Sequence, residues 1–167
     1  MLVFVVRGTK KFLDRAGKVD AADERPSTTV LGDWYATVWF WRPQVALFVN
    51  DRTLLPIPIP MAPSATIVQR FVAGMPETFG DYGLDPRFVE AEVEQMTTHR
   101  LAKTASRSVL GVMNEFKLMA DNYLHQADDV DLQELALWLA QTPCRPLYER
   151  HVSPNRELRA VAAEHMP

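Results

Sequence analysis

The chain has 167 residues, of which 47% are hydrophobic and 23% are charged, a balance typical of a soluble globular protein and not of a disordered one. This length can bury a core and predicts one domain over residues 1–167, with an exposed loop at 17–29 and a C-terminal helix or tail at 154–167. The formal net charge of −3 gives no electrostatic reason to expect broad nucleic-acid binding.

Cysteine usage and hydropathy indicate a cytoplasmic protein without a membrane partner. Cys144 is the only cysteine, so no intrachain disulfide forms, as is typical of a reducing compartment. The apolar run Leu2–Val6 is too short for a signal peptide, and no stretch is long enough to cross a membrane. The four histidines lack metal-ligand spacing, and we expect neither a metal nor a cofactor.

The first part of the chain predicts β-strands. Leu2–Val6 is a continuous apolar run typical of a buried strand, and Thr9 follows as a candidate cap for a short helix over Lys10–Ala16. Trp34–Trp41 has no polar face, which indicates a central strand, and Val45–Val49 returns beside it after a turn. These patterns predict the start of a β-meander.

Three prolines at alternate positions mark the next segment, Thr53–Met61, as an edge strand. Alternate residues of a strand direct their N–H groups to opposite neighbours, so the prolines spoil one side only. The residues between the prolines should point to the core: Leu55, Ile57, Ile59 and Met61. The length of the turn at Asn50–Arg52 leaves the register with Val45–Val49 open.

Helices dominate the rest of the chain and make the fold class α+β. The predicted elements are a helix from Ser64 to Gly74–Pro76, one from Asp85–Pro86, a short strand Thr98–Lys103, a long helix 108–124, a helix capped by Asp131 and a last helix capped by Ser153. Because strands joined by tight turns come first, we expect an antiparallel meander packed against several helices, not a doubly wound parallel sheet.

The polar lead-in to the long helix is the most suggestive site. Hydroxyls and cations precede the helix N-terminus, where free N–H groups favour an anion; the candidate ligand-binding residues are Lys103, Thr104, Ser106, Arg107, Ser108 and Asn114. The alternative, which the residues favour, is that Ser106 or Ser108 is an ordinary cap. Asn114, at the margin of the apolar stripe, either binds a ligand or ties the helix to a loop.

Other segments carry weaker signals, each with a structural alternative. Lys10 and Lys11 follow a strand and would form a small basic site or lie solvated. The aromatic strand Trp34–Trp41 is more typical of a core than of a base-stacking platform. Asn50–Asp51 suits a turn better than a metal site, and Cys144 suits a buried structural role.

Four short motifs in this order resemble an uncharacterised bacterial family, a domain of unknown function: Thr9–Lys11, Leu31–Ala36, Leu47–Asn50 with Thr53, and Thr104–Asn114. The likeness spans roughly Val3 to Tyr148. The resemblance implies a compact bacterial domain; it supplies no activity and carries over no catalytic residue.

Three functional hypotheses follow, and we favour the first. It is a non-catalytic binding or regulatory module whose small anionic ligand or protein partner meets the surface around Lys103–Asn114. The second is a metal-independent, nuclease-like enzyme, which needs His99 or another acid–base group near Arg107. The third is a homo-oligomeric structural component such as a homodimer, suggested by strands with two apolar faces.

Overall fold

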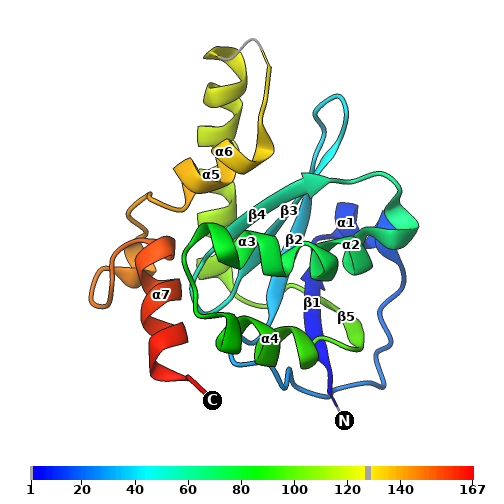
Figure 1. The fold of residues 1–167 in the computed structure, drawn as a ribbon. Helices are drawn as coiled ribbons and strands as arrows, with labels where there is room; N and C mark the ends of the chain where they lie inside the picture. The colour runs from blue at the N-terminus through cyan, green and yellow to red at the C-terminus, as the bar shows by residue number, and fades with distance from the viewer. Residues whose placement is uncertain (1, 127–128) are drawn as a thin grey trace.

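The computed structural model describes residues 2–126 and 129–167, and a single five-stranded sheet lies at its centre (Figure 1). The strands lie side by side in the order β4-β3-β2-β1-β5. Their bounds are β1 Phe4–Gly8, β2 Trp34–Trp39, β3 Val45–Asn50, β4 Pro56–Pro60 and β5 His99–Lys103. Helices complete an α+β structure, as predicted.

The sheet is mixed, so the expectation of an antiparallel sheet holds only for β2, β3 and β4. β1 runs parallel to both β2 and β5, and its Val6 lies opposite Trp34 on one side and Leu101 on the other. The segment between β1 and β2 contains α1 (Lys10–Ala16), which allows the chain to return to the starting end of the sheet. A strand buried on both faces, such as β1, is typical of such parallel pairing.

β4 lies at one edge of the sheet, which confirms the interpretation of its prolines. Leu55 C=O accepts a hydrogen bond from Asn50 N–H at 3.1 Å, so Leu55 and the alternate residues after it direct their backbone N–H and C=O groups to β3. The backbone nitrogens of the prolines, which carry no hydrogen, therefore lie on the side of β4 that has no neighbouring strand. α6 (Leu132–Leu139) packs along this edge and buries Pro58.

The pairing of β3 with β4 settles the register that the sequence left open. Phe48 lies opposite Ile57 and Ala46 opposite Ile59, so these residues share one face and one apolar cluster. The other face of β3 joins a second cluster with Trp39 and residues of two further helices.

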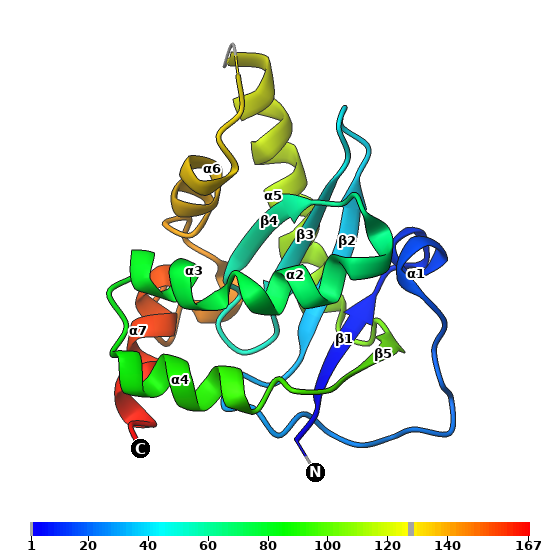
Figure 2. The ribbon, with the colours of Figure 1, turned by 45° about the vertical axis from the view of Figure 1, so that its right-hand side comes forward.

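Helices cover both apolar faces (Figure 1 and Figure 2). One face packs against α1 and four further helices: α2 Ile67–Ala73, α3 Met75–Asp81, α4 Pro86–Glu94 and α7 Pro154–Glu164. The other face packs against α5 (Arg107–Gln126) and α6. The chain's own helices thus account for the absence of a polar face on β2.

Capping side chains locate two helix starts as predicted, whereas α3 was not expected. Asp85 and Asp131 accept hydrogen bonds from the first backbone N–H groups of α4 and α6. The helix expected to end at Gly74–Pro76 is instead a 3₁₀ turn, Ser64–Thr66, followed by α2. The next helix, α3, begins directly after Gly74, because a proline in the first turn is compatible with the start of a new helix.

The last helix has the predicted start but not the predicted cap. Ser153 precedes α7, yet its hydroxyl donates to Asn155 Oδ1 at 2.5 Å and makes no cap hydrogen bond. Of the helices in residues 2–126 and 129–167, none combines the length and apolarity of a membrane span.

Candidate functional site

The carboxyl ends of β1 and β5 lie side by side, with Gly8 opposite Lys103. The chain leaves these two ends toward opposite faces of the sheet, since α1 buries Phe12 in one apolar cluster and α5 buries Phe116 in the other. In open sheets, such a divergence forms a crevice outside the strand ends, where ligands commonly bind. This end of the sheet is therefore where the fold predicts a ligand site.

A small cavity of about 50 Å³ lies beyond the end of β1. Its walls come from the turn into α1, the second half of β2 and one side of α5, and its lining residues are Thr9, Lys11, Thr37, Trp39, Leu110, Met113, Asn114 and Lys117. We call these residues the crevice. The space holds a few water molecules or one compact anionic group.

Two threonine hydroxyls lie together in the crevice. Thr9 stands at the N-cap position of α1, but its hydroxyl makes no cap hydrogen bond and lies 3.0 Å from Thr37 Oγ1. The predicted side-chain cap is therefore wrong. Thr9 N–H donates to Ala36 C=O, which holds Thr9 against β2, where its hydroxyl meets that of Thr37. One hydroxyl donates to the other, so one O–H remains for a ligand.

Trp39 adds a buried donor to the crevice. Its side chain is 1% exposed, and its Nε1–H has no hydrogen-bond partner in the described part of the chain. An unpaired buried N–H costs roughly 1–3 kcal/mol, and folded proteins pair nearly all such groups with protein, water or ligand. Trp34 has the same unpaired Nε1 on the other face of the sheet, so an unpaired indole N–H does not by itself mark a site; Trp39 differs from Trp34 in that it lines a cavity.

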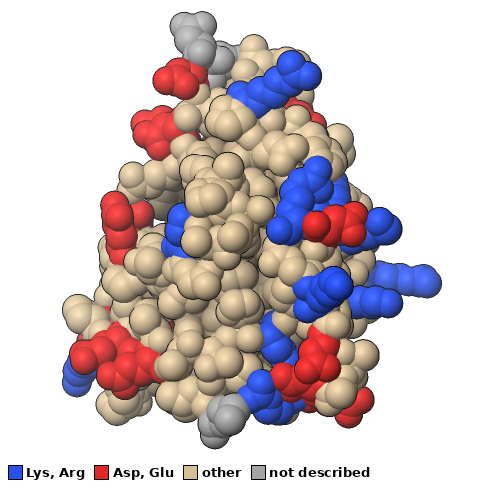
Figure 3. All heavy atoms as spheres, turned by 90° about the vertical axis from the view of Figure 1, so that its right-hand side faces the viewer, with Lys and Arg blue, Asp and Glu red and all other residues tan. Residues whose placement is uncertain are grey.

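Lysines from two helices line the crevice, and each ammonium group lies against a neighbouring side chain. Lys11 of α1 lies with its Nζ 5.3 Å from the ring centroid of Phe40, and Lys117 of α5 lies with its Nζ 2.5 Å from Asp121 Oδ2. Burial raises the pKa of the Asp121 carboxyl, but hydrogen bonds from Lys117 and Trp41 outweigh it and hold this pKa below its ordinary value. Figure 3 shows Lys and Arg side chains gathered on the face that carries α1.

The structure places the six predicted ligand residues in two groups. Asn114 lines the crevice, whereas the other five lie between the last residue of β5 and the first turn of α5 and do not line it: Lys103, Thr104, Ser106, Arg107 and Ser108. Ser106 caps α5, since its Oγ accepts from Val109 N–H at 3.2 Å, and its own N–H donates to the Tyr35 hydroxyl at 2.9 Å. The capping alternative is confirmed.

Asn114 is exposed, not partly buried as expected, because the buried side of α5 is formed by its neighbours Val112 and Met113. Its amide makes no hydrogen bond within the described residues, so it does not tie the helix to a loop. Gly111 is exposed as well, and nothing lies within 4 Å of the position a Cβ would take.

Three crevice residues were not anticipated: Thr37, Trp39 and Lys117. Lys117 was within reach of the sequence, because it lies three positions after Asn114 and therefore on the same side of a helix. Thr37 carries no signal beyond that of a buried strand, and the sequence offers Trp39 as part of a core or a base-stacking platform, not as a donor to an anion.

The histidines lie away from the lead-in to α5. His99 begins β5, and this five-residue strand separates it by about 13 Å from Lys103; burial lowers the His99 pKa. His125 lies about 27 Å along α5 from Arg107. The other two flank α7, on the opposite side of the molecule from β5 (Figure 2): His151 and His165. The histidines therefore do not supply the acid–base group that the nuclease-like hypothesis needs near Arg107; an acid–base side chain that does lie beside this segment is Tyr35, whose hydroxyl accepts from Ser106 N–H.

Two further motifs have structural roles. Asn50 is fully buried; its Nδ2 donates to Leu31 C=O at 2.9 Å, and its Oδ1 accepts from both N–H and Oγ1 of Thr53. This confirms turn chemistry at Asn50. Cys144 is buried, which raises the pKa of its thiol to about 11. Within the described residues, no group of three or more His, Cys, Asp or Glu side chains is arranged to hold a metal.

Comparison with known proteins confirms the resemblance to an uncharacterised family. Residues 5–157 match the model of a family described as a domain of unknown function, and this range includes every crevice residue. No curated protein and no solved structure matches the chain. The chain belongs to the family of domains of unknown function DUF6933.

Proposed function

We propose that this protein is a non-catalytic binding or regulatory module that binds a small organic anion in the crevice. One observation carries the proposal: Lys11, Trp39 and Lys117, from three elements distant in sequence, converge on one cavity outside the carboxyl end of β1. The convergence combines positive charge with a buried donor that has no partner within the described residues.

The chemistry of these groups favours an oxyanion. Its oxygens would accept hydrogen bonds from Trp39 Nε1–H and from the free O–H of the Thr9–Thr37 pair. The ammonium groups of Lys11 and Lys117 add charge-assisted contacts, each of about 1.5–3 kcal/mol. In this proposal Lys103 and Arg107, outside the cavity, raise the local positive potential without contacting the ligand.

Two observations favour binding over the alternatives. The lining of the crevice contains no His, Asp, Glu or Cys side chain among the described residues, so the usual general acids and bases are not in its wall. The homo-oligomer hypothesis was motivated by strands with two apolar faces, and both faces are covered by the chain's own helices.

Calorimetric titration with inorganic sulfate and phosphate tests the proposal. We expect Lys11→Met and Lys117→Met each to weaken binding about tenfold, because each removes one charge-assisted contact of roughly 1.4 kcal/mol or more. Lys10→Met is the matched control, since Lys10 has the same charge but is exposed, pairs with Asp14 and does not line the crevice. No binding by the wild type, or equal losses in all three variants, would contradict the proposal.

A further inference from the structure

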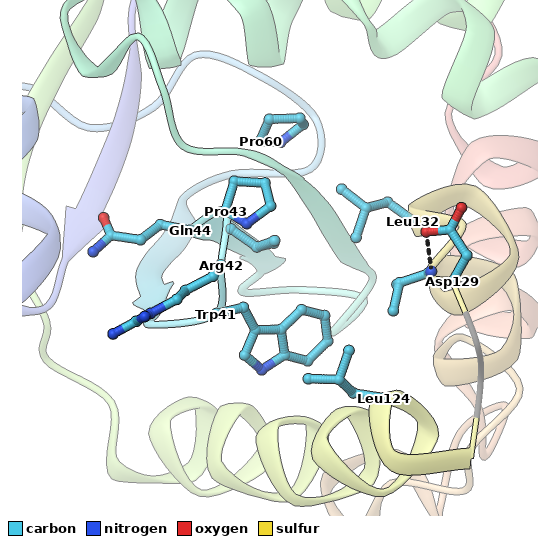
Figure 4. A pocket seen from close by; sticks show the side chains of 10 residues that line it. Trp41, Arg42, Pro43, Gln44, Pro60, Leu124, Asp129 and Leu132 are labelled. Carbon is cyan, nitrogen blue, oxygen red and sulfur yellow. Dashed lines mark hydrogen bonds between the residues drawn. The ribbon is translucent and has the colours of Figure 1, made fainter.

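A second and larger pocket, of about 330 Å³, lies between the β2–β3 hairpin and the last turns of α5 (Figure 4). Most of its wall is apolar and includes Trp41, Pro43, Pro60, Leu124 and Leu132. Its polar groups are Arg42, Gln44 and Asp129, and Figure 4 shows the Arg42 and Gln44 side chains extending away from Leu132. We call this the aromatic pocket. Its size and its mainly apolar lining with a few polar groups are typical of small-molecule sites.

A hydrogen bond from its indole N–H holds Trp41 in place in this pocket. Its Nε1–H donates to Asp121 Oδ1 at 3.0 Å, so the indole has its hydrogen bond within the protein and its ring remains available for apolar contact. Figure 4 shows the ring between the hairpin and Leu124 of α5.

The aromatic pocket and the crevice have no lining residue in common, but their walls contact each other. Trp41 lines the former and Trp39 the latter, and their ring centroids lie 4.8 Å apart. Asp121 also joins them, because it accepts from Trp41 and pairs with Lys117 of the crevice. From Lys117 to Leu124 the rise along α5 is about 10 Å, the length of a small two-ring molecule with an acidic substituent.

We infer that the anion bound in the crevice carries a planar aromatic group, which packs against Trp41 in the aromatic pocket. This inference rests on the proposed function and extends it by naming the ligand class: an aromatic carboxylate, sulfonate or phosphate about 10 Å long. Aromatic rings gain from offset or tilted packing on an indole, and an apolar group displaces water from the walls formed by Leu124 and Leu132.

Calorimetry with an inorganic and an aromatic anion tests the inference: sulfate, which carries two negative charges, and 2-naphthalenesulfonate, which carries one. We expect the wild type to bind the naphthyl probe at least tenfold more tightly than sulfate. Trp41→Ala should abolish this ratio. Because Trp41 also holds Asp121 and packs on Trp39, Leu124→Ala is the variant that should change sulfate affinity less than twofold, since Leu124 lines the aromatic pocket and not the crevice. Phe40→Ala is the matched control, because Phe40 is the preceding aromatic, is 54% exposed and packs under Lys11 and Arg15 instead of lining the pocket; the ratio should persist.

Each other outcome overturns the inference. If both probes bind with equal affinity and Lys117→Met weakens both, the crevice binds anions but the aromatic pocket takes no part. If naphthyl binding depends on Trp41 but not on Lys11 or Lys117, the aromatic pocket acts alone and the inference fails, whereas the proposed function fails only if sulfate binding in the crevice is absent as well. Circular dichroism checks that Trp41→Ala is folded; if it is not, Leu124→Ala, from the opposite wall, replaces it with the same expected loss of ratio.

Discussion

Asp121 forms an ion pair with Lys117, one of the two lysines that line the crevice. Its two carboxylate oxygens are divided between Trp41 and Lys117, and the Lys117 side chain is 37% exposed. In the free protein, the carboxylate therefore neutralises one of the two lysines to which we assign ligand binding. A ligand anion must compete with Asp121 for that ammonium group.

Asp121→Asn should tighten sulfate binding about fivefold, equivalent to roughly 1 kcal/mol for a partly exposed ion pair. The amide removes the competing charge and keeps an oxygen that accepts from Trp41 Nε1–H. Asp14→Asn changes the net charge equally but frees Lys10, outside the crevice. Equal tightening in both variants by calorimetry would mean that only overall charge matters.

Glu157 makes stability dependent on pH in the acidic range. Its side chain is 1% exposed; burial raises the pKa of the carboxyl, but hydrogen bonds from Arg150 and His151 outweigh burial and lower this pKa below its ordinary value of 4.5. A lowered folded-state pKa means that the stabilisation is complete above about 4.5 and is lost as the pH falls through the folded value.

We expect the free energy of unfolding, measured in urea, to fall between pH 5 and pH 3 by less in Glu157→Gln than in the wild type. The glutamine variant should also be less stable at pH 7, because Arg150 and His151 lose their charged partner. Parallel pH profiles for the two proteins would show that other carboxyl groups govern acid unfolding.

At the scale of elements, α5 organises the crevice, the aromatic pocket and one core. Ser106 caps its first turn and is hydrogen-bonded to Tyr35 of β2, which fixes where the helix starts on the sheet. One side of the helix buries Val109 and Phe116, and an adjacent row from Leu110 to Lys117 borders the crevice. The register of this helix therefore determines which residues reach a ligand.

Gly111→Ala should stabilise the protein by about 0.5–1 kcal/mol, since glycine in a helix interior is disfavoured relative to alanine by that amount. Gly111 is exposed in α5, and no atom lies within 4 Å of the added methyl group. Thermal unfolding measures the gain, and sulfate affinity should be unchanged. Destabilisation, or weaker sulfate binding, would indicate that this surface contacts something that the isolated chain does not show.

At the scale of the whole molecule, two apolar cores lie on opposite faces of one sheet. The residues of β2 alternate between them, Trp34 in one core and Trp39 in the other. The two cores share the strands β2 and β3, so disruption of this sheet exposes both. Cys144 belongs to the second core and reports on its integrity.

Cys144 should react with 5,5′-dithiobis(2-nitrobenzoate) at pH 8 at least about a hundredfold more slowly in native buffer than in urea. Burial raises its pKa to about 11, so little thiolate is present, and the sulfur is shielded as well. The native rate should rise with the unfolded fraction across the urea transition. Rapid reaction in native buffer would indicate local opening of the second core.

The candidate site was only partly predictable. Asn114 and the basic segment Lys10–Lys11 were identified from their place next to a helix or strand end, which is local information. Trp39 was not, because a tryptophan in an apolar strand has the same pattern whether or not its N–H meets a partner. The five polar residues before Val109 had a local signal, and the structure shows that part of it was helix capping.

The features that depend on neighbouring residues could be predicted without the structure: the edge strand with its three prolines, the caps Asp85 and Asp131, and the buried run in β1. Backbone hydrogen-bonding capacity and side-chain periodicity are local properties, so these needed no knowledge of the rest of the chain. Long-range contacts, in contrast, are set in the folded chain: the parallel pairing of β1 with β2 and β5, and the meeting of Lys11, Trp39 and Lys117. Those contacts depend on which distant segments share a sheet and on which face each helix packs, and no local pattern encodes that choice.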